Sequence, residues 1–348
     1  MTIPATITSV GENAFNDAGL LSLIWESNTS LTAKQVERLK EARPNILIFV
    51  KDEDVMPSKG IDNVVINGVA ESLVLTENSP FHSIQTFTAQ SATFSHRFTM
   101  ETGKGASAGW ETIALPFDVQ VYRHESKGEV VPFAKYTEGS KAKPFWLYRL
   151  TSGGFVEAQA IEANKPYLIS MPNNAAYYDE DCLNGKVQFT ASSVTIKRTD
   201  EAEMTNVSYE GKTLRPTFAA VDRGSTVYAI NATGDFSTAT GGGTAGSLFV
   251  RDLRAVRPFE AYFDSGSANA REFITINFAD ETATGIDSTF DVPRSMVNGQ
   301  RSMVNVYNMA GQLVYSGSTE GLNAAKQQLP AGLYVVSSAN GVSRVRAY

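Results

Sequence analysis

The sequence of 348 residues contains a single cysteine, Cys182, and only three histidines. One thiol excludes an intrachain disulfide framework and a zinc site built on several cysteines. No segment approaches the run of about 18 apolar residues that suggests a membrane-spanning helix, so we expect no membrane span. Clustered Lys and Arg are also missing, and the formal net charge is -7. A nucleic-acid partner is therefore disfavoured, because phosphate binding requires a basic surface.

The overall composition is that of a globular protein. Hydrophobic residues make up 42% and charged residues 19% of the chain, which argues against extended disorder. At roughly 150 residues per domain, this length predicts two to three domains. We predict three units, spanning residues 1–50, 51–280 and 281–348, and leave open whether the middle unit divides again near residue 200.

The densest group of aromatic and aliphatic residues lies between residues 109 and 172, so we expect the main core there. Apolar side chains occupy every second position of one segment: Ile113, Leu115, Phe117, Val119 and Val121. This period of two predicts a half-buried strand, with Ala114, Asp118 and Gln120 on its other face. Pro116 cannot donate to a ladder, so we place this strand at a sheet edge or a bulge.

Short apolar runs separated by turn residues continue through residues 51–280. Seven or more such runs predict an antiparallel β-sandwich or open barrel, and the whole chain is predicted to be mainly β. Before this region, Thr32 is placed to cap a helix that ends before Pro44, and residues 45–50 read as a strand.

The N-terminal residues follow a repeat-like order. Ile3-Pro4 is followed by Ser9-Val10-Gly11, by Ala14-Phe15 and by a Leu-x-Ser-Leu segment at residues 20–23, with strands expected at Ile7–Val10 and Leu20–Ile24. This order resembles the BspA-type leucine-rich repeat of Bacteroides-type surface proteins. The resemblance implies the last repeat of a longer array, capped by the helix and strand that follow. We therefore expect that upstream repeats and a signal peptide are missing from this chain.

Two further segments carry resemblances. The phrases GWETIALPFDV, KPFWLYRL, ANKPYLISMPNN and RPFEAYF are similar to the β domain that follows such repeats, for which the resemblance implies a location rather than a reaction. After a small polar linker at residues 279–289, strands at Val304–Val306, LVY and LPAGLYVV and a turn at Asn340-Gly341 predict a small Ig-like sandwich. This segment is similar to the C-terminal sorting domain of type IX secretion.

Few residues suggest chemistry. We expect His82 and His96 on sheet surfaces and His124 in a solvated hairpin, and no cofactor or metal. Three acidic residues precede Cys182, which does not suit a nucleophilic thiolate. The acidic clusters at residues 52–54 and 179–181 lack the spacing of a calcium loop and are predicted to be solvated.

Aromatic side chains offer the one candidate binding group. Trp110, Trp146 and Tyr148 are predicted to belong to the core, as most aromatics in β domains do. Tyr177 and Tyr178 are predicted to lie in a loop flanked by amide side chains, and we name a speculative ligand-binding group. It consists of Asn173, Asn174, Tyr177 and Tyr178.

The sequence therefore favours a non-catalytic protein, secreted or on the cell surface, that adheres to a host protein, matrix or glycan. One alternative is a carbohydrate-active enzyme or glycan-binding accessory module, in which Asp118, Glu157 and Glu260 would supply paired carboxylates. Another is an architectural spacer within a longer repeat protein. The oligomeric state stays open.

Overall fold

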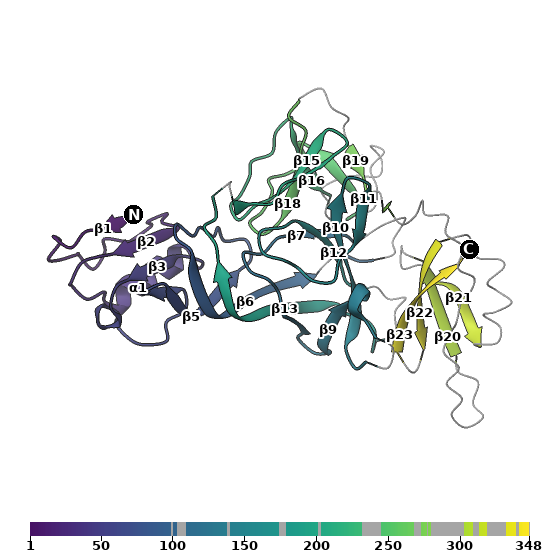
Figure 1. Ribbon diagram of the computed structural model, residues 1–348, viewed down its shortest axis with the longest axis horizontal. Coiled ribbons are helices and arrows are strands. Elements are labelled where there is room, and N and C mark those ends of the chain that lie inside the picture. Colours follow the sequence, from purple (N-terminus) through teal and green to yellow (C-terminus); the bar gives the residue numbers. More distant parts are fainter. Residues whose placement is uncertain are drawn as a thin grey trace.

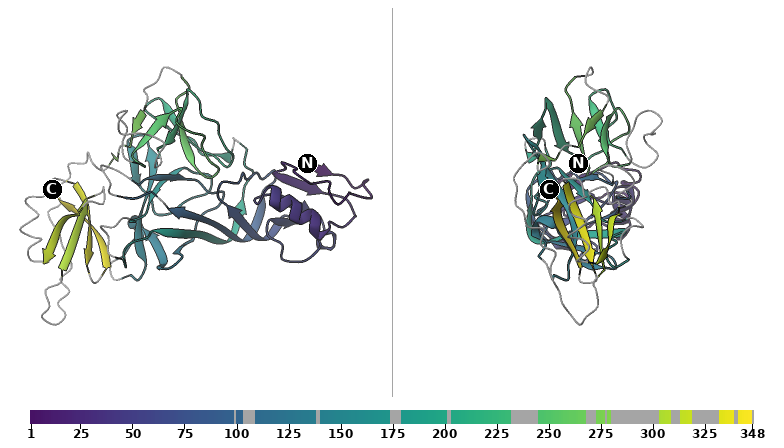
Figure 2. Two further views of the ribbon diagram at one scale, coloured as in Figure 1. Left: turned by 180° about the vertical axis from the view of Figure 1, so that it is seen from behind. Right: turned by 90° about the vertical axis from the view of Figure 1, so that its right-hand side faces the viewer.

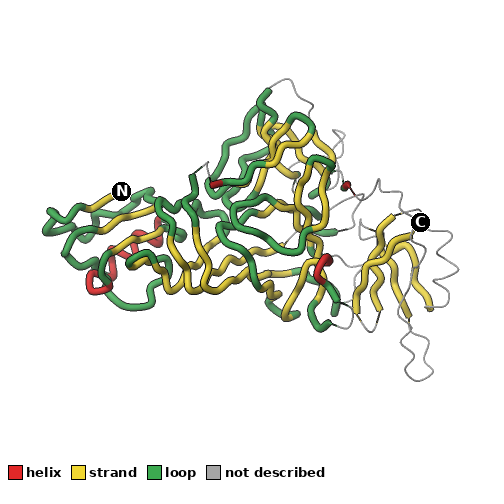
Figure 3. The backbone as a smooth tube through the Cα atoms, viewed as in Figure 1, coloured by secondary structure: helices red, strands yellow, loops and turns green. Residues whose placement is uncertain are grey.

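The computed structural model places most of the chain in strands, which confirms a mainly β fold (Figures 1 and 3). The N-terminal end lies at one end of the molecule and the C-terminal sheet at the other, with a second sheet standing on the large one between them (Figures 1 and 2). The structure describes residues 1–98, 100–102, 109–137, 140–173, 179–200, 203–231, 245–267, 273–276, 278–279, 303–308, 313–318, 332–338 and 341–347.

The first 196 residues form one large mixed sheet. Its hydrogen-bonded order is β1-β2-β3-β4-β5-β6-β13-β8-β9-β10-β12-β7, and β11 pairs with β10. The strands are β1 Thr2–Ile3, β2 Ser22–Trp25, β3 Leu47–Val50, β4 Val64–Ile66, β5 Val69–Thr76, β6 Phe87–Phe98, β7 Glu111–Ile113, β8 Val121–His124, β9 Gly128–Pro132, β10 Lys143–Thr151, β11 Gly154–Glu157, β12 Tyr167–Ser170 and β13 Gly185–Ile196. Two 3-10 turns, Glu53–Val55 and Phe133–Lys135, lie between them.

The prediction of an antiparallel sandwich or open barrel for residues 51–280 is wrong for this sheet, because β5 is parallel to β6 and β9 is parallel to β10. Before that region, strands β1 to β4 are also parallel to one another. Parallel neighbours need a crossover, and the segments between the first four strands supply one each. The sheet also continues through residue 50, while the predicted domain boundaries near 50 and 280 stay predictions.

The capping helix is confirmed as α1, Ala33–Ala42. Thr32 accepts a hydrogen bond from the N–H of Gln35, and the Gln35 side chain returns one to Thr32, which completes a capping box. The strand predicted at 45–50 is β3, and the one at 20–24 is β2. The strand expected at Ile7–Val10 is wrong, because that segment turns after Pro4 and only Val10 packs against the core.

The long strand predicted from Ile113 to Val121 is also wrong. Strand β7 ends at Ile113, before Pro116, and no ladder forms until β8 begins at Val121. Leu115, Phe117 and Val119 are nevertheless buried, whereas Val121 is 40% exposed. The alternation thus marks an extended segment with one buried side, and β7 lies at the edge of the sheet as Pro116 suggested.

The alternation of buried and exposed residues is interrupted at the same position along three neighbouring strands, β5, β6 and β13. Buried positions there step by three residues instead of two, from Ala70 to Leu73, Ala89 to Ala92 and Ala191 to Val194. Ser193 has φ of 54° at this level, a left-handed conformation that a non-glycine residue rarely adopts. The aligned steps keep all three strands facing the same core, as a bulge does in a single pair.

The second sheet is antiparallel and curled, with the order β14-β15-β18-β16-β17-β19. Its strands are β14 Val207–Tyr209, β15 Lys212–Pro216, β16 Val227–Ile230, β17 Leu248–Arg251, β18 Ala261–Asp264 and β19 Phe273–Thr275. It shares its core with the large sheet: Trp110 and Trp146 cluster with Tyr228 and Phe249, and Phe259 enters the cluster of the large sheet. The two sheets therefore fold against each other rather than as separate bodies.

The C-terminal segment forms a four-stranded antiparallel sheet in the order β21-β20-β22-β23. Its strands are β20 Met303–Asn308, β21 Leu313–Ser318, β22 Gly332–Ser338 and β23 Gly341–Ala347, which confirms the three predicted strands. The linker after Ala279 and the turn residue Asn340 lie outside the described residues. No helix in the described ranges is long and apolar enough to cross a membrane.

Replacing Ser193 with Gly should stabilise the fold by roughly 0.5 to 1 kcal/mol. Glycine removes the steric strain of the left-handed backbone, although it also increases the entropy of the unfolded chain. Urea unfolding would measure the difference. Ser192→Gly is the matched control, because Ser192 is exposed with ordinary backbone geometry and should lose stability instead. Equal effects of the two changes would contradict the assigned strain.

Candidate functional site

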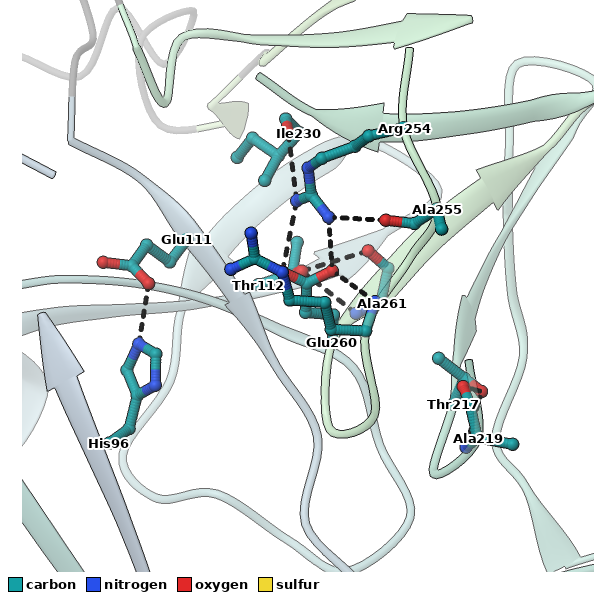
Figure 4. A network of polar contacts seen from close by, with 11 residues as sticks. His96, Glu111, Thr112, Thr217, Ala219, Ile230, Arg254, Ala255, Glu260 and Ala261 are labelled. Carbon is teal, nitrogen blue, oxygen red and sulfur yellow. Dashed lines mark hydrogen bonds and ion pairs between the residues drawn. The ribbon is translucent and has the colours of Figure 1, made fainter. Parts of the chain in front are cut away.

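A network of polar side chains and backbone groups lies where the two sheets meet, around β7 (Figure 4). The Thr112 hydroxyl donates to the Ala261 carbonyl at 3.0 Å and accepts from the Ala261 N–H at 3.0 Å. The Ala114 N–H donates to the Phe259 carbonyl at 2.8 Å. On its other side β7 pairs with β12. This short strand therefore belongs to the large sheet through its ladder and to the second sheet through a side chain.

The turn before β18 is held by an ion pair. The Arg254 guanidinium donates to both carboxylate oxygens of Glu260, at 2.8 and 3.1 Å, and also to the Ile230 carbonyl at 3.2 Å. Glu260 in turn accepts from the Arg257 N–H at 2.8 Å. A bidentate pair is geometrically specific, so it fixes the path of the chain just before Ala261.

Phe259 is the residue that enters the core of the large sheet. It is 3% exposed, and its ring centroid lies 4.9 Å from that of Phe94 and 5.7 Å from that of Phe218. Its φ is 68°, an outlier for a bulky side chain. Its N–H donates to the Thr217 carbonyl at 2.8 Å. Burial and paired backbone groups hold this residue in a conformation that it would not adopt in isolation.

His96 lies between two carboxylates that come from different segments. Its Nδ1 is 2.6 Å from Glu77 Oε2, and its Nε2 is 2.7 Å from Glu111 Oε2. The ring also packs edge-on against Phe98, with centroids 4.7 Å apart. The side chains of His96, Glu77 and Glu111 are 26%, 37% and 13% exposed. The prediction of a surface histidine is wrong, because His96 faces inward with Phe94 and Phe98.

Two opposing effects set the protonation of His96. Burial lowers its pKa, but the hydrogen bonds and charges of Glu111 and Glu77 outweigh burial and raise the pKa from 6.5 to about 10. The same contact with His96 lowers the pKa of Glu77. At neutral pH His96 is thus an imidazolium between two carboxylates. This ionic contact links the end of β5 to β6 and β7.

The geometry around His96 does not suit a metal ion. Each ring nitrogen faces its own carboxylate, so the two carboxylates lie on opposite sides of the imidazole instead of converging on one point. Across the part of the chain that the structure describes, no group of three His, Cys, Asp or Glu side chains is arranged to hold a metal. The arrangement holds one positive charge between two negative charges and links three segments, namely the end of β5, β6 and β7.

The other two histidines have distinct surroundings. His82 is half-buried and its Nδ1 lies 3.0 Å from Thr199 Oγ1. His124 does lie at a hairpin turn, but the prediction that it is solvated is wrong, since it is only 2% exposed. A glycine at position 185 leaves room for its ring, as a Cβ there would approach Nε2 to 3.0 Å.

The acidic cluster at residues 179–181 contains a buried ion pair that sequence reasoning missed. Asp181 is 1% exposed and accepts a 3.0 Å hydrogen bond from Lys143 Nζ. The prediction of a solvated loop therefore fails for Asp181, while Asp179 and Glu180 are exposed. Cys182 is half-buried and packs against the aromatic cluster shared by the two sheets.

The three carboxylates proposed as a catalytic group serve different partners. Asp118 accepts from the Ala163 N–H at 2.7 Å, Glu157 lies 3.5 Å from the Tyr148 hydroxyl, and Glu260 holds Arg254. Each is thereby placed by its own local contact, and sequence spacing gave no signal of these contacts.

The speculative binding group is described only in part. Asn173 is 4% exposed, and its amide accepts from the Thr102 N–H at 2.9 Å and donates to the Met100 carbonyl at 2.7 Å. Asn174, Tyr177 and Tyr178 lie outside the described residues. Three other aromatic residues, Trp110, Trp146 and Tyr148, are at most 4% exposed and belong to the core, as predicted.

Comparisons with models of known families, with curated proteins and with solved structures find no match to this chain. The geometry of the chain itself is therefore the basis for the functional argument.

Replacing His96 with Gln should lower stability by roughly 2 kcal/mol at pH 6, because charge-assisted hydrogen bonds are lost. Since the pKa of His96 is raised to about 10, its contribution is complete below pH 6.5 and declines as the pH rises toward 10. Since the pKa of Glu77 is lowered, its contribution holds above about pH 4.5 and declines below. Urea unfolding between pH 4 and 10 should show the difference shrinking at both ends. A constant difference for His96→Gln across this pH range would contradict the assignment.

Replacing Thr112 with Val should cost about 1 to 3 kcal/mol, since it leaves the N–H and carbonyl of Ala261 without their partner at a buried contact. Thr112→Ser should retain most of the stability, because it keeps the hydroxyl. Thr190→Val, at a half-buried position on the outer face, should change stability by less than about 0.5 kcal/mol. Thermal unfolding would compare the three. A fully stable Thr112→Val variant would show that this hydroxyl does not help to join the sheets, which would then be held by the Ala114–Phe259 backbone hydrogen bond and the shared core.

Proposed function

We propose that the chain is a non-catalytic binding protein, displayed on a cell surface or secreted, whose partner is a host or matrix protein. The observation that carries this proposal is a row of uncharged β-branched side chains across the outer face of the large sheet. Register places Val74, Thr93, Thr190 and Val121 directly opposite one another on β5, β6, β13 and β8.

This row is open to solvent while the opposite face of the same strands is core. Val74 is 37% and Val121 40% exposed, and Thr93 and Thr190 between them are half-buried. The neighbouring inward row is formed by Leu75, Phe94 and Phe189. A row of methyl and hydroxyl groups suits another protein surface, because apolar area is removed from water while the hydroxyls keep hydrogen bonds.

A protein partner is favoured over a glycan. Sugar rings stack on exposed aromatic faces, and Phe273 is the one aromatic residue among the exposed large hydrophobic side chains of the described chain. The ionised side chains at the sheet junction also support a binding role over catalysis. His96, Arg254 and Glu260 are engaged in cross-links within the fold.

The finer architectural assignments belong to the same proposal. We infer that the parallel strands β1 to β4 with α1 form a leucine-rich-repeat unit and its cap. We also infer that the C-terminal sheet is part of an Ig-like sorting domain, which would direct the chain to the outside of the cell. Both rest on the resemblances of residues 3–23 and of the last 60 or so residues.

The spacer alternative is favoured by one observation, the separation of the N-terminal end from the C-terminal sheet along the longest axis (Figure 1). In that case binding would reside outside the described surface, and the outer face of the large sheet would be inert.

Surface plasmon resonance of the full chain against purified matrix and host-surface proteins, with a glycan array beside it, tests the proposal. Thr190→Lys places a charge at the centre of the row and should weaken binding at least about tenfold. Ser208→Lys, exposed on β14, is the control and should bind like the unmodified chain.

A partner bound equally by both variants would assign binding to another surface, and retention of no protein would overturn the proposal. Binding to glycans alone would point to the glycan module. Release of reducing ends from polysaccharides that is abolished by Asp118→Asn or Glu157→Gln would establish an enzyme.

A further inference from the structure

The hairpin between β8 and β9 is closed by a histidine side chain. His124 pairs with Gly128, which leaves a three-residue connection, and Gly128 has φ of 79°. Three-residue hairpins commonly combine a type I turn with such a left-handed residue. The His124 Nδ1 accepts hydrogen bonds from the N–H groups of Ser126 and Lys127, each at 3.2 Å. It takes the role that Asn, Asp or Ser plays at the start of many turns.

The ring is enclosed between this turn and the beginning of β13. His124 is 2% exposed, its ring interacts with the backbone of Leu183 and Asn184, and a Cβ at Gly185 would approach its Nε2 to 3.0 Å. Nε2 itself is buried and has no hydrogen-bond partner among the described residues. Two N–H donors point at Nδ1, so we assign the neutral tautomer that carries its proton on Nε2. The turn therefore depends on an unprotonated Nδ1.

We propose that His124 makes the β8–β9 turn an acid-sensitive element, which opens locally when Nδ1 takes up a proton while the rest of the large sheet stays folded. A proton on Nδ1 would face the N–H groups of Ser126 and Lys127, so both hydrogen bonds are lost. The imidazolium would also be enclosed. The backbone of Asn184 and Leu183 favours the charged form, but burial is the larger effect and disfavours it. The open turn exposes the ring to water and removes both penalties.

The charged groups around the ring do not compensate a positive charge. Lys127 of the same turn disfavours protonation, and Glu125 favours it. Glu125 is already paired with Arg97 of β6 at 3.1 Å and accepts from the Lys186 N–H of β13 at 2.9 Å.

A second ion pair lies nearby in the loop before β13. Asp181 there is bound to Lys143 of β10.

Burial is the largest effect on His124 and lowers its pKa below the usual 6.5. Opening therefore binds a proton that the closed turn excludes.

The junction of β5, β6 and β7 does not open with the turn, because the half-buried His96 responds to a different pH range. The pKa of His96 is about 10, so His96 stays charged from pH 8 to pH 5. The junction of β5, β6 and β7 therefore keeps its hydrogen bonds over the range in which His124 titrates.

Hydrogen exchange of the full chain between pH 8 and pH 5, corrected for the intrinsic pH dependence of exchange, tests the proposal. The opening constant of the Ser126 and Lys127 amides should rise by up to about tenfold per pH unit below pH 6.5. Amides in β10 and β12 should keep their protection. The NMR titration of the His124 ring should have its midpoint below pH 6.5.

His124→Asn is the matched variant, because its side-chain oxygen can accept from the same N–H groups and does not titrate. It should abolish the pH dependence at Ser126 and Lys127, whereas His82→Asn should leave it unchanged. Unchanged pH dependence in His124→Asn, or pH-independent protection in the unmodified chain, would overturn the proposal. If His124→Asn does not fold, the ring titration decides, because a midpoint at or above pH 6.5 overturns the proposal as well.

Discussion

The edge of a sheet carries backbone groups that need partners, and the edge strand β7 meets this requirement where the two largest sheets join. Its backbone pairs with β12 on one side. On the other side the Thr112 hydroxyl and the Ala114 N–H form hydrogen bonds with the segment from Phe259 to Ala261. An edge strand is otherwise a site of aggregation. Because the second sheet covers this edge, the strained Phe259, the Arg254–Glu260 pair and the shared aromatic core all depend on the same contact.

The half-buried His96 and the buried His124 show how surroundings decide what one residue type does. His96 faces two carboxylates and is held as a cation, whereas His124 faces two N–H donors and is held neutral. Burial lowers the pKa of each, so the difference lies in the partners. One histidine strengthens contacts among three segments across a wide pH range, and the other limits the range over which a single turn is closed.

Sequence reasoning succeeded where the signal was local. The Thr32 cap and Pro44 bounded α1, and alternation around Val306 located strands of the C-terminal sheet. It failed at Leu115 to Val119, because alternation reports an extended backbone with one buried side and does not report whether a neighbour supplies a ladder. The mixed direction of the large sheet was missed for the same reason, since strand pairing is decided by distant segments.

The candidate site was out of reach of sequence patterns because its contacts join distant residues. Glu111 and Glu77 lie 15 and 19 positions from His96, and Thr112 lies 149 positions from Ala261. No motif marks such pairs, and a lone histidine on an alternating strand is compatible with either face. Once folded, these polar groups are engaged in cross-links. The outer face of β5, β6, β13 and β8 presents the uncharged row of Val74, Thr93, Thr190 and Val121, flanked by exposed Arg97, Arg123 and Lys186. The proposed binding role is consistent with this arrangement, since a surface held in place by internal cross-links loses less entropy when a partner docks.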